Sequence, residues 1–294
     1  MTDRLVLGTV QLGMPYGVNN KVGKPDFSCA RDIIKTAFDH GITRFDTSQA
    51  YGDSEEVLGR VFDDLKINTK VKVYSKLDPK LDLCDGFSVQ QSVENSLRKL
   101  NIDKLEGLLV HHEDGLNYWN QGLGEVLQWL VAKGKIKLVG ASFYVPQKAL
   151  DALDIDGIDI IQVPANILDR RFENSGVFSK AKEDKKDVFV RSVFLQGLLL
   201  MNLNNVPMSM QDVLPFLERF EQMACDMKLR RQELAMKYVA QRWPNAFVLF
   251  GAEAKEQVLD NVKAFCSKPI LNINEGAFKN VPENILNPIH WPKL

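Results

Sequence analysis

Short apolar runs alternate with longer segments of amphipathic, helix-like periodicity from one end of the chain to the other. Such alternation is typical of repeated βα units, in which helices join parallel strands and cover them. We expect strands at 5–9, 43–46, 71–76, 107–111, 138–142, 158–163, 188–192 and 247–250. We expect helices at 28–40, 53–65, 87–100, 121–133, 146–153, 173–184, 210–226 and 254–266.

Eight strands, each followed by a helix, within about 250 residues have the size and order of a TIM barrel. The sequence therefore predicts the α/β fold class, with a (β/α)8 barrel that forms a single domain over residues 1–294. An extra helix is expected at about 229–243, before the eighth strand, and the tail after Lys268 is expected to lie over the barrel. A doubly wound sheet is the competing fold, but no Gly-x-Gly-x-x-Gly motif follows the first strand.

Polar and aromatic residues predict three further features of the fold: a helix cap, a long loop and the packing of the tail. Ser88 is expected to cap the third helix, and Gln91, three residues later, completes a capping box. The polar segment 201–210 is expected to be a long loop. Phe278 and Trp291 are expected to pack the tail onto the protein, with closure over a pocket as the alternative.

The composition narrows the class of protein. Hydrophobic residues make up 45% of the 294 residues and charged residues 26%, which is ordinary for a soluble globular protein. The formal net charge is −1, so the chain lacks the excess of positive charge that attracts nucleic acids, and no nucleic-acid partner is expected. No apolar run approaches the ~20 residues that cross a bilayer, and no signal-peptide segment precedes the first strand, so no membrane partner is expected.

The cysteines lie far apart, without the spacing of metal ligands, at Cys29, Cys84, Cys225 and Cys266. Scattered thiols of this kind are typical of reduced, cytosolic proteins. We therefore expect a cytoplasmic protein without a metal site. No coiled-coil or repeat pattern predicts an oligomeric state.

Polar residues follow three successive strands where each one ends. Asp46, Lys76 and His111 hold these positions, and Tyr51 lies on the loop after Asp46. The active site of a TIM barrel lies at the carboxyl ends of its strands, and charged residues are rarely buried unless they are paired. Each residue alone fits a structural ion pair or a satisfied core histidine, but the four together fit an active site better.

These four residue types suit proton transfer to a carbonyl group. A free tyrosine has a pKa of ~10, which is too high for efficient acid–base work near neutrality. We expect the Lys76 ammonium to lower the pKa of Tyr51, and Asp46 to hold the lysine charged. A neutral His111, which continues the inward alternation of its strand better than His112, could hydrogen-bond the substrate oxygen.

With these residues in this order, the sequence resembles the aldo-keto reductases over essentially its whole length. In that family a (β/α)8 barrel binds NAD(P)H without a Rossmann fold, and an Asp-Tyr-Lys-His tetrad reduces carbonyl compounds. The segments that carry the resemblance are 8–9, 41–47, 51–52, 75–76, 109–111, 134–136, 140–142, 162–166, 192–197 and 251–261.

The resemblance implies a role for each matching position. Tyr51 would be the general acid, tuned by Lys76 and Asp46, and His111 would position the carbonyl. The implied cofactor-binding residues are Gly8, Thr9, Ser142, Gln162, Arg191, Ser192, Leu195, Gly197, Gly251, Glu253, Gln257 and Asn261. Among them, Ser142 and Gln162 would hold the nicotinamide carboxamide, 192–197 the pyrophosphate, and 251–261 the adenosine at a helix N-terminus. The candidate substrate-binding residues are Tyr16, His112 and Phe143.

Two residues near the nicotinamide position depart from the family pattern. Phe143 stands where asparagine is usual, and Arg191 stands where an aromatic residue usually stacks on the nicotinamide. A planar guanidinium can stack, but it would repel the positive ring of the oxidised cofactor. We therefore expect Arg191 to favour the reduced cofactor, with pairing to a carboxylate at the site mouth as the alternative.

The residues expected at the adenosine of the cofactor do not decide between NAD(H) and NADP(H). Glu253 would repel the 2′-phosphate of NADP(H), whereas Lys255 and Gln257 could serve it. NADP(H) is the slight preference, because it is the habit of the family, and NAD(H) is the alternative.

Taken together, the sequence predicts an NAD(P)H-dependent oxidoreductase that reduces a small-molecule aldehyde or ketone, with sugar-like carbonyls among the candidates. A cofactor-sensing or partner-binding protein without catalysis is one alternative. A Schiff-base aldolase that uses Lys76 is the other.

Overall fold

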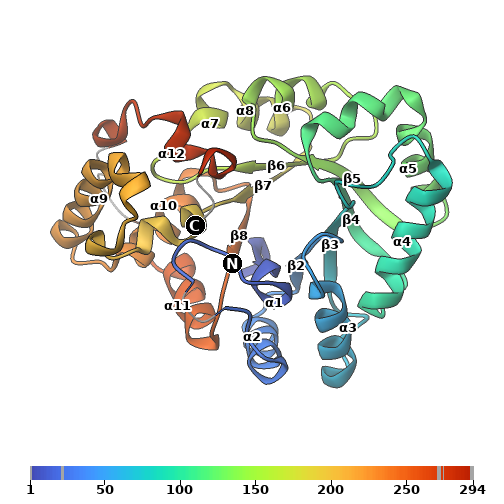
Figure 1. Ribbon diagram of the computed structural model, residues 1–294, viewed down its shortest axis with the longest axis horizontal. Coiled ribbons are helices and arrows are strands. Elements are labelled where there is room, and N and C mark those ends of the chain that lie inside the picture. The colour runs from blue at the N-terminus through green and yellow to red at the C-terminus, as the bar shows by residue number, and fades with distance from the viewer. Residues whose placement is uncertain (1, 21–22, 270–272, 274, 292–294) are drawn as a thin grey trace.

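Eight parallel strands form a closed barrel in the order β1 to β8 in the computed structural model, and helices surround it (Figure 1). The structure describes residues 2–20, 23–269, 273 and 275–291. Strand β8 closes the sheet by pairing with β1, with Leu7 opposite Phe250. The predicted (β/α)8 barrel is therefore confirmed. The single-domain organisation over 1–294 stays a prediction, which this one closed sheet favours.

The strands are β1 Leu5–Gly8, β2 Arg44–Asp46, β3 Lys72–Lys76, β4 Leu105–Val110, β5 Ile136–Ser142, β6 Ile160–Pro164, β7 Asp187–Arg191 and β8 Phe247–Gly251. The helices are α1 Val10–Gly13, α2 Phe27–Asp39, α3 Ser54–Leu65, α4 Gly86–Leu100, α5 Leu123–Ala132, α6 Pro146–Leu153, α7 Arg171–Asn174, α8 Val177–Glu183, α9 Leu214–Asp226, α10 Arg231–Arg242, α11 Lys255–Cys266 and α12 Glu283–Leu286. Longer 3-10 segments lie at Glu113–Gln121, Leu195–Leu200 and Met208–Val213.

The predicted elements are confirmed, with differences of a few residues at their ends. Helix α10 is the extra helix expected before the eighth strand. The single helix expected at 173–184 is wrong, because Gly176 takes a φ of 89° and divides it into α7 and α8. The loop expected at 201–210 contains two 3-10 segments, and α9 begins only at Leu214.

The expected cap of α4 is also wrong. The helix begins at Gly86, and the carboxylate of Asp85 accepts a hydrogen bond from the Phe87 backbone N–H. The Ser88 hydroxyl donates to the same Asp85 side chain. Both residue types can cap a helix, but the acceptor that stands before the first turn is the one that meets unpaired N–H groups.

The barrel interior is filled by large apolar side chains. Its inward cluster comprises Val6, Tyr74, Leu109, Ile160, Phe189 and Leu249. The Tyr74 and Phe189 rings have centroids 4.8 Å apart. Gly107 leaves the space for them, because a Cβ there would lie 2.5 Å from the Tyr74 ring. This packed layer supports the polar groups at the carboxyl ends of the strands.

The tail lies against the outside of the barrel, as predicted. Phe278 is buried and meets Phe220 of α9 edge to face, and Glu283 pairs with Arg171 of α7. Trp291 is partly buried and donates to the Ile285 carbonyl. Residues 270–272, 274 and 292–294 of the predicted tail lie outside the described residues. Within the described part, the aromatic residues pack the tail.

No helix in the described ranges combines the length and the apolar character that a membrane crossing requires.

Candidate active site

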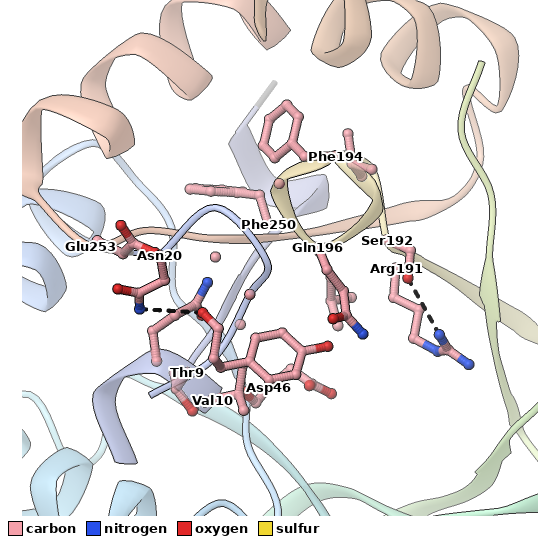
Figure 2. Close-up of a pocket in the computed structure, with 18 of the residues that line it drawn as sticks. Thr9, Val10, Asn20, Asp46, Arg191, Ser192, Phe194, Gln196, Phe250 and Glu253 are labelled. Atoms are coloured by element: carbon pink, nitrogen blue, oxygen red, sulfur yellow. Dashed lines mark hydrogen bonds between the residues drawn. The ribbon is translucent and has the colours of Figure 1, made fainter. Parts of the chain in front are cut away.

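A cavity of about 400 Å³ opens where the strands end. Every strand contributes to its wall, either with its own residues or with the residue directly after it, and Figure 2 shows part of this wall. The predicted site residues that line the cavity are Gly8, Thr9, Tyr16, Asp46, Tyr51, Lys76, His111, Ser142, Gln162, Arg191, Ser192, Gly197, Gly251, Glu253, Gln257 and Asn261. The fold thus brings together residues that are spread over most of the sequence.

A buried ion pair lies at the centre of the site. The Lys76 ammonium is 1% exposed and lies 2.6 Å from a carboxylate oxygen of Asp46. It also donates to the Thr47 carbonyl, at 3.0 Å, while the Gln162 amide donates to the second Asp46 oxygen, at 2.9 Å. Burial lowers the pKa of Lys76 and Asp46 opposes that effect, because the carboxylate favours the charged amine.

Tyr51 lies beside this pair, with the Lys76 nitrogen 5.0 Å from the centre of its ring. Lys76 was expected to lower the pKa of Tyr51, but in the protein alone this pKa is raised overall. Burial raises the pKa of Tyr51, and the negative charge of Asp46 raises it further, because both disfavour a phenolate. The phenol therefore keeps its proton at physiological pH, which is the form that a general acid needs.

His111 is neutral, as expected. Burial and the neighbouring Lys76 charge lower its pKa to about 3. One ring nitrogen lies 3.1 Å from the Ser48 hydroxyl, and the ring meets Tyr51 edge to face, with centroids 5.8 Å apart. A neutral imidazole in this position can hydrogen-bond a substrate oxygen without adding charge.

Close backbone packing places the Tyr51 loop. A Cβ on Gly13 would lie 1.8 Å from the Tyr51 carbonyl oxygen, and one on Gly52 would lie 2.3 Å from the Gly13 oxygen. Gly52 also has a φ of 57°, which glycine adopts without strain. The two glycines let helix α1 and the Tyr51 loop touch, so they determine where the phenol lies.

Small hydroxyl side chains join the ends of β1 and β2 to the start of α3. The Thr9 hydroxyl donates to the Asp46 carbonyl, at 2.9 Å, and lies 2.8 Å from the Ser54 hydroxyl. The Thr47 hydroxyl donates a hydrogen bond to the Ser54 hydroxyl, at 3.0 Å. Thr9 was predicted for the cofactor, but the bonds of its hydroxyl show that it also holds Asp46 in place.

The segment after β7 turns sharply along the cavity. Ser192, Leu195, Gln196 and Gly197 all have positive φ values, of 61°, 47°, 52° and 91°. Backbone of this kind can turn successive N–H groups toward an anion. The Gln196 carbonyl accepts a hydrogen bond from Val18, so this segment meets the 17–20 segment beside the cavity.

Two glutamines suggest that the cavity is built for a polar ligand. The Gln11 and Gln232 side-chain oxygens are buried and have no hydrogen-bond partner among the described residues, and both residues line the cavity. Buried polar atoms of this kind usually have a partner. Together with the reach of the cavity from Tyr51 to the first turn of α11, they fit an extended polar ligand such as a nicotinamide dinucleotide.

Arg191 lines the cavity together with the predicted catalytic residues Tyr51, Lys76 and His111. We call the part of the cavity that holds these residues its catalytic end. Its guanidinium rests on the Tyr144 ring, 4.1 Å from the centroid, and donates to the Phe143 carbonyl at 3.0 Å and the Ser192 hydroxyl at 3.3 Å. It forms no ion pair with any carboxylate of the described residues, so the alternative of a carboxylate partner is wrong. Its expected stacking on the nicotinamide stays a prediction.

Three predicted site residues do not line this cavity. Leu195 and Phe143 are buried in the hydrophobic core. His112 is exposed, stacks on His111, and lines a neighbouring cavity instead. Adjacent residues on a strand or loop point in different directions, so a side chain next to a site residue often faces elsewhere.

Sequence reasoning also missed residues that line the cavity. They are Val10, Gln11, Gly17, Asn19, Asn20, Leu200, Gln232, Leu249 and Phe250. Val193, Phe194, Gln196 and Asp260 also line the cavity, within the segments 192–197 and 251–261 that were expected at the cofactor, and Tyr144 lines it beside the predicted Phe143. The missed residues lie mainly after β1, on α10 and on β8, whereas the prediction concentrated on strand ends and family motifs. Val10 and Gln11, which follow the first strand, offered an available signal, because a TIM barrel places the segment after each strand at the site.

The sequence model described as the Aldo/keto reductase family matches residues 4–272. The chain belongs to the aldo/keto reductase family. The resemblance seen in the tetrad is therefore confirmed, and the chain is an oxidoreductase by family.

Individual relatives support this assignment. The chain is 27% identical to the NADH-specific methylglyoxal reductase of Escherichia coli (strain K12), over 92% of this chain and 90% of that protein. It is 29% identical to the aldo-keto reductase YhdN of Bacillus subtilis (strain 168), over 67% of this chain and 60% of that protein. The glycerol dehydrogenase structure from Gluconobacter oxydans superposes with a TM-score of 0.73, at 25% identity, covering 99% of this chain and 93% of that one.

The glycine contact should be essential for the position of Tyr51. We expect Gly13→Ala to lower the reductase kcat roughly 100-fold, because the new methyl group displaces the Tyr51 backbone by an ångström or more. The measurement is the steady-state rate with an aldehyde, together with the melting temperature. The control is Gly86→Ala at the start of α4, where a Cβ has no neighbour closer than 3.7 Å. Equal rates in the two variants would show that the contact does not position Tyr51.

The low pKa of His111 should appear in the pH dependence of stability. An unfolded histidine has a pKa of ~6.5, so on acidification the unfolded chain binds a proton that folded His111, with a pKa of about 3, does not. Stability is therefore lost as the pH falls from 6.5 toward 3. Between pH 7 and 5, we expect the wild type to lose about 2 kcal/mol more free energy of unfolding than His111→Gln, as measured by urea denaturation. Parallel losses would mean that His111 titrates normally.

Proposed function

We propose that the protein is an NAD(H)-dependent reductase that converts an aldehyde or ketone to an alcohol, with Tyr51 as general acid. The observation that carries this proposal is the position of Tyr51 beside the buried Lys76–Asp46 pair, in a cavity that extends to the first turn of α11. Membership of the aldo/keto reductase family supports it.

When bound, the nicotinamide cofactor would supply a hydride to the carbonyl carbon. The Tyr51 hydroxyl would donate its proton to the carbonyl oxygen, which leaves a phenolate on the tyrosine. The Lys76 ammonium, 5.0 Å from the ring, would stabilise that phenolate by its charge. Lys76 thus acts on the state after proton transfer, whereas burial keeps the proton on Tyr51 before it.

The remaining residues hold these groups in place. Asp46 and Gln162 fix the Lys76 ammonium, and the neutral His111 can donate a hydrogen bond to the same carbonyl oxygen. Ser142, which is buried and lines the cavity, would bind the carboxamide of the cofactor together with Gln162. The 192–197 segment would bind the pyrophosphate, and Gln11 and Gln232 would bind polar groups of the cofactor.

The Schiff-base aldolase is less well supported than the reductase. A nucleophilic lysine needs a free lone pair, but the Lys76 nitrogen donates hydrogen bonds to Asp46 and to the Thr47 carbonyl. Borohydride trapping with a carbonyl substrate would detect a Schiff base if one formed. The non-catalytic alternative is also less well supported, because all four members of the tetrad line one cavity.

For the cofactor, the described residues favour NAD(H) over the NADP(H) that the family habit suggested. Glu253 lines the cavity next to α11, where its carboxylate would repel a 2′-phosphate and could accept hydrogen bonds from a ribose hydroxyl. The neighbouring cations are already paired: Lys255 with Asp32, and Arg230 with Asp260, which itself lines the cavity. Among the described lining residues, the cations are Lys76 and Arg191, and both contact groups at the catalytic end.

The partner is a small carbonyl compound that Tyr16 and Tyr144, which line the cavity, would contact. Four free cysteines support a cytoplasmic, reducing location.

The reductase proposal is tested by cofactor oxidation at 340 nm with a panel of aldehydes, ketones and sugars. We expect Tyr51→Phe to lower kcat by roughly 100-fold or more, because general acid catalysis contributes 10²–10⁴-fold. Cofactor binding by fluorescence titration should stay within about twofold, since the lost group is one hydroxyl. A wild-type protein that binds the cofactor but reduces nothing in the panel would favour the non-catalytic alternative.

The cofactor preference is tested by fluorescence titration at pH 8. We expect the Kd of NADH to be about tenfold lower than that of NADPH, because an unshielded carboxylate–phosphate contact costs at least 1.4 kcal/mol. Glu253→Gln should narrow that ratio. The control is Glu256→Gln, which removes an exposed acid of α11 that does not line the cavity. Tighter binding of NADPH to the wild type would restore the NADP(H) expectation.

A further inference from the structure

The cavity carries an unbalanced positive charge at its catalytic end. Lys76 is balanced there by Asp46, and His111 is neutral. Arg191 adds a charge that no carboxylate of the described residues balances by an ion pair. Glu253 lies on the opposite side of the cavity from Arg191 (Figure 2). A ligand that enters the catalytic end therefore meets a net positive charge.

The guanidinium of Arg191 is held in place by neutral groups. Two of its N–H groups donate to the Phe143 carbonyl and the Ser192 hydroxyl, and one face rests on the Tyr144 ring. These contacts fix the plane of the guanidinium, but because the partners are neutral they do not neutralise its positive charge. Arginine has further N–H donors in a geometry that matches carboxylate and phosphate oxygens. A half-buried cation has lost part of its hydration. Binding an anion would compensate for that loss of free energy.

We propose that Arg191 makes this reductase specific for anionic carbonyl compounds, by binding a carboxylate or phosphate group of the substrate close to the carbonyl carbon. The inference rests on the proposed reductase function and deepens it. The guanidinium is near enough to the reacting groups for its charge to lower the pKa of Tyr51, Lys76 and His111. Arg191 and Tyr51 line the same cavity, so an anion on Arg191 would share that cavity with the Tyr51 hydroxyl.

The chemistry of the surrounding wall supports this class of substrate. Tyr16, Tyr144 and Ser192 line this part of the cavity and offer hydroxyl groups, which can donate to the same anion. Three carboxylate residues of the described chain line the cavity. Asp46 is paired with Lys76 and Asp260 with Arg230, while Glu253 lies on the opposite side from Arg191. An anionic substrate thus meets donors at this end and no unpaired carboxylate of the described residues.

The test compares carbonyl substrates that carry an anionic group with matched neutral compounds. The pairs are 4-oxobutanoate against its methyl ester, and glyceraldehyde 3-phosphate against glyceraldehyde. We expect the wild type to have the higher kcat/KM for the anion of at least one pair, and that pair identifies carboxylate or phosphate as the group bound. In Arg191→Gln the anion-to-neutral ratio should fall roughly 10- to 100-fold, which is the usual value of hydrogen bonds to a charged group. Arg191→Lys should retain part of the ratio, because it keeps the charge but loses the planar fork.

Lys137→Gln is the matched control, because Lys137 is an exposed cation at the amino end of β5, paired with Glu106 and outside the cavity. It removes the same charge and should leave the ratio unchanged. A ratio that falls equally in both variants, or that Arg191→Gln leaves intact, would overturn the proposal. So would a wild type that prefers the neutral member of both pairs.

A binding measurement keeps the proposal testable without turnover. Oxamate and inorganic phosphate are titrated calorimetrically into the NADH-bound wild type and into NADH-bound Arg191→Gln. We expect at least one anion to bind the wild type roughly 10- to 100-fold more tightly. Equal binding of both anions would overturn the role of Arg191, whereas absent turnover with intact anion binding would overturn the reductase function instead. A change confined to the affinities for NADH and NAD⁺ would assign Arg191 to the cofactor and overturn the proposal.

Discussion

The Lys76 ammonium is almost fully withdrawn from water, and the geometry of the whole site follows from that constraint. A buried cation is tolerated where an anion and further hydrogen-bond acceptors surround it. Asp46 and the Thr47 carbonyl provide these groups, and Gln162 in turn donates to Asp46. Strands β2, β3 and β6 are therefore tied together across the barrel by polar bonds. Removing one member would leave a buried charge without its partner, so the group can be expected to act as a unit.

The same burial decides which protons are present. It keeps the proton on Tyr51 and removes the charge from His111, because both effects avoid an unpaired charge in a medium of low polarity. A neutral phenol and a neutral imidazole then flank a paired cation, which is the arrangement on which the proposed carbonyl reduction depends. Arg191 departs from this pattern, since it brings a charge that the described residues do not pair. The departure makes Arg191 the natural place to look for substrate specificity.

Rigid and variable parts of the barrel have separate roles. The interior layer around Tyr74 and Phe189 forms a packed base, and the close contact of Gly13 with the Tyr51 loop fixes the position of Tyr51. Loops on the same face carry most of the remaining cavity wall, as is usual for barrels of this kind. Relatives named as methylglyoxal reductase and glycerol dehydrogenase fit such a division, with a common frame and different substrates.

The barrel, and the four polar residues grouped at one of its ends, could be predicted without coordinates. Periodicity of apolar residues shows where strands and helices lie, and a parallel barrel places every strand end on one face, so Asp46, Lys76 and His111 could be grouped without coordinates. The direction of individual side chains could not be predicted and follows from the three-dimensional packing: Phe143 and Leu195 are buried in the core, His112 faces another cavity, and Gln232 reaches the site from α10. Tertiary structure also decided protonation, because the pKa of Tyr51 depends on burial and on the place of the Asp46 charge, which are properties of packing between distant segments.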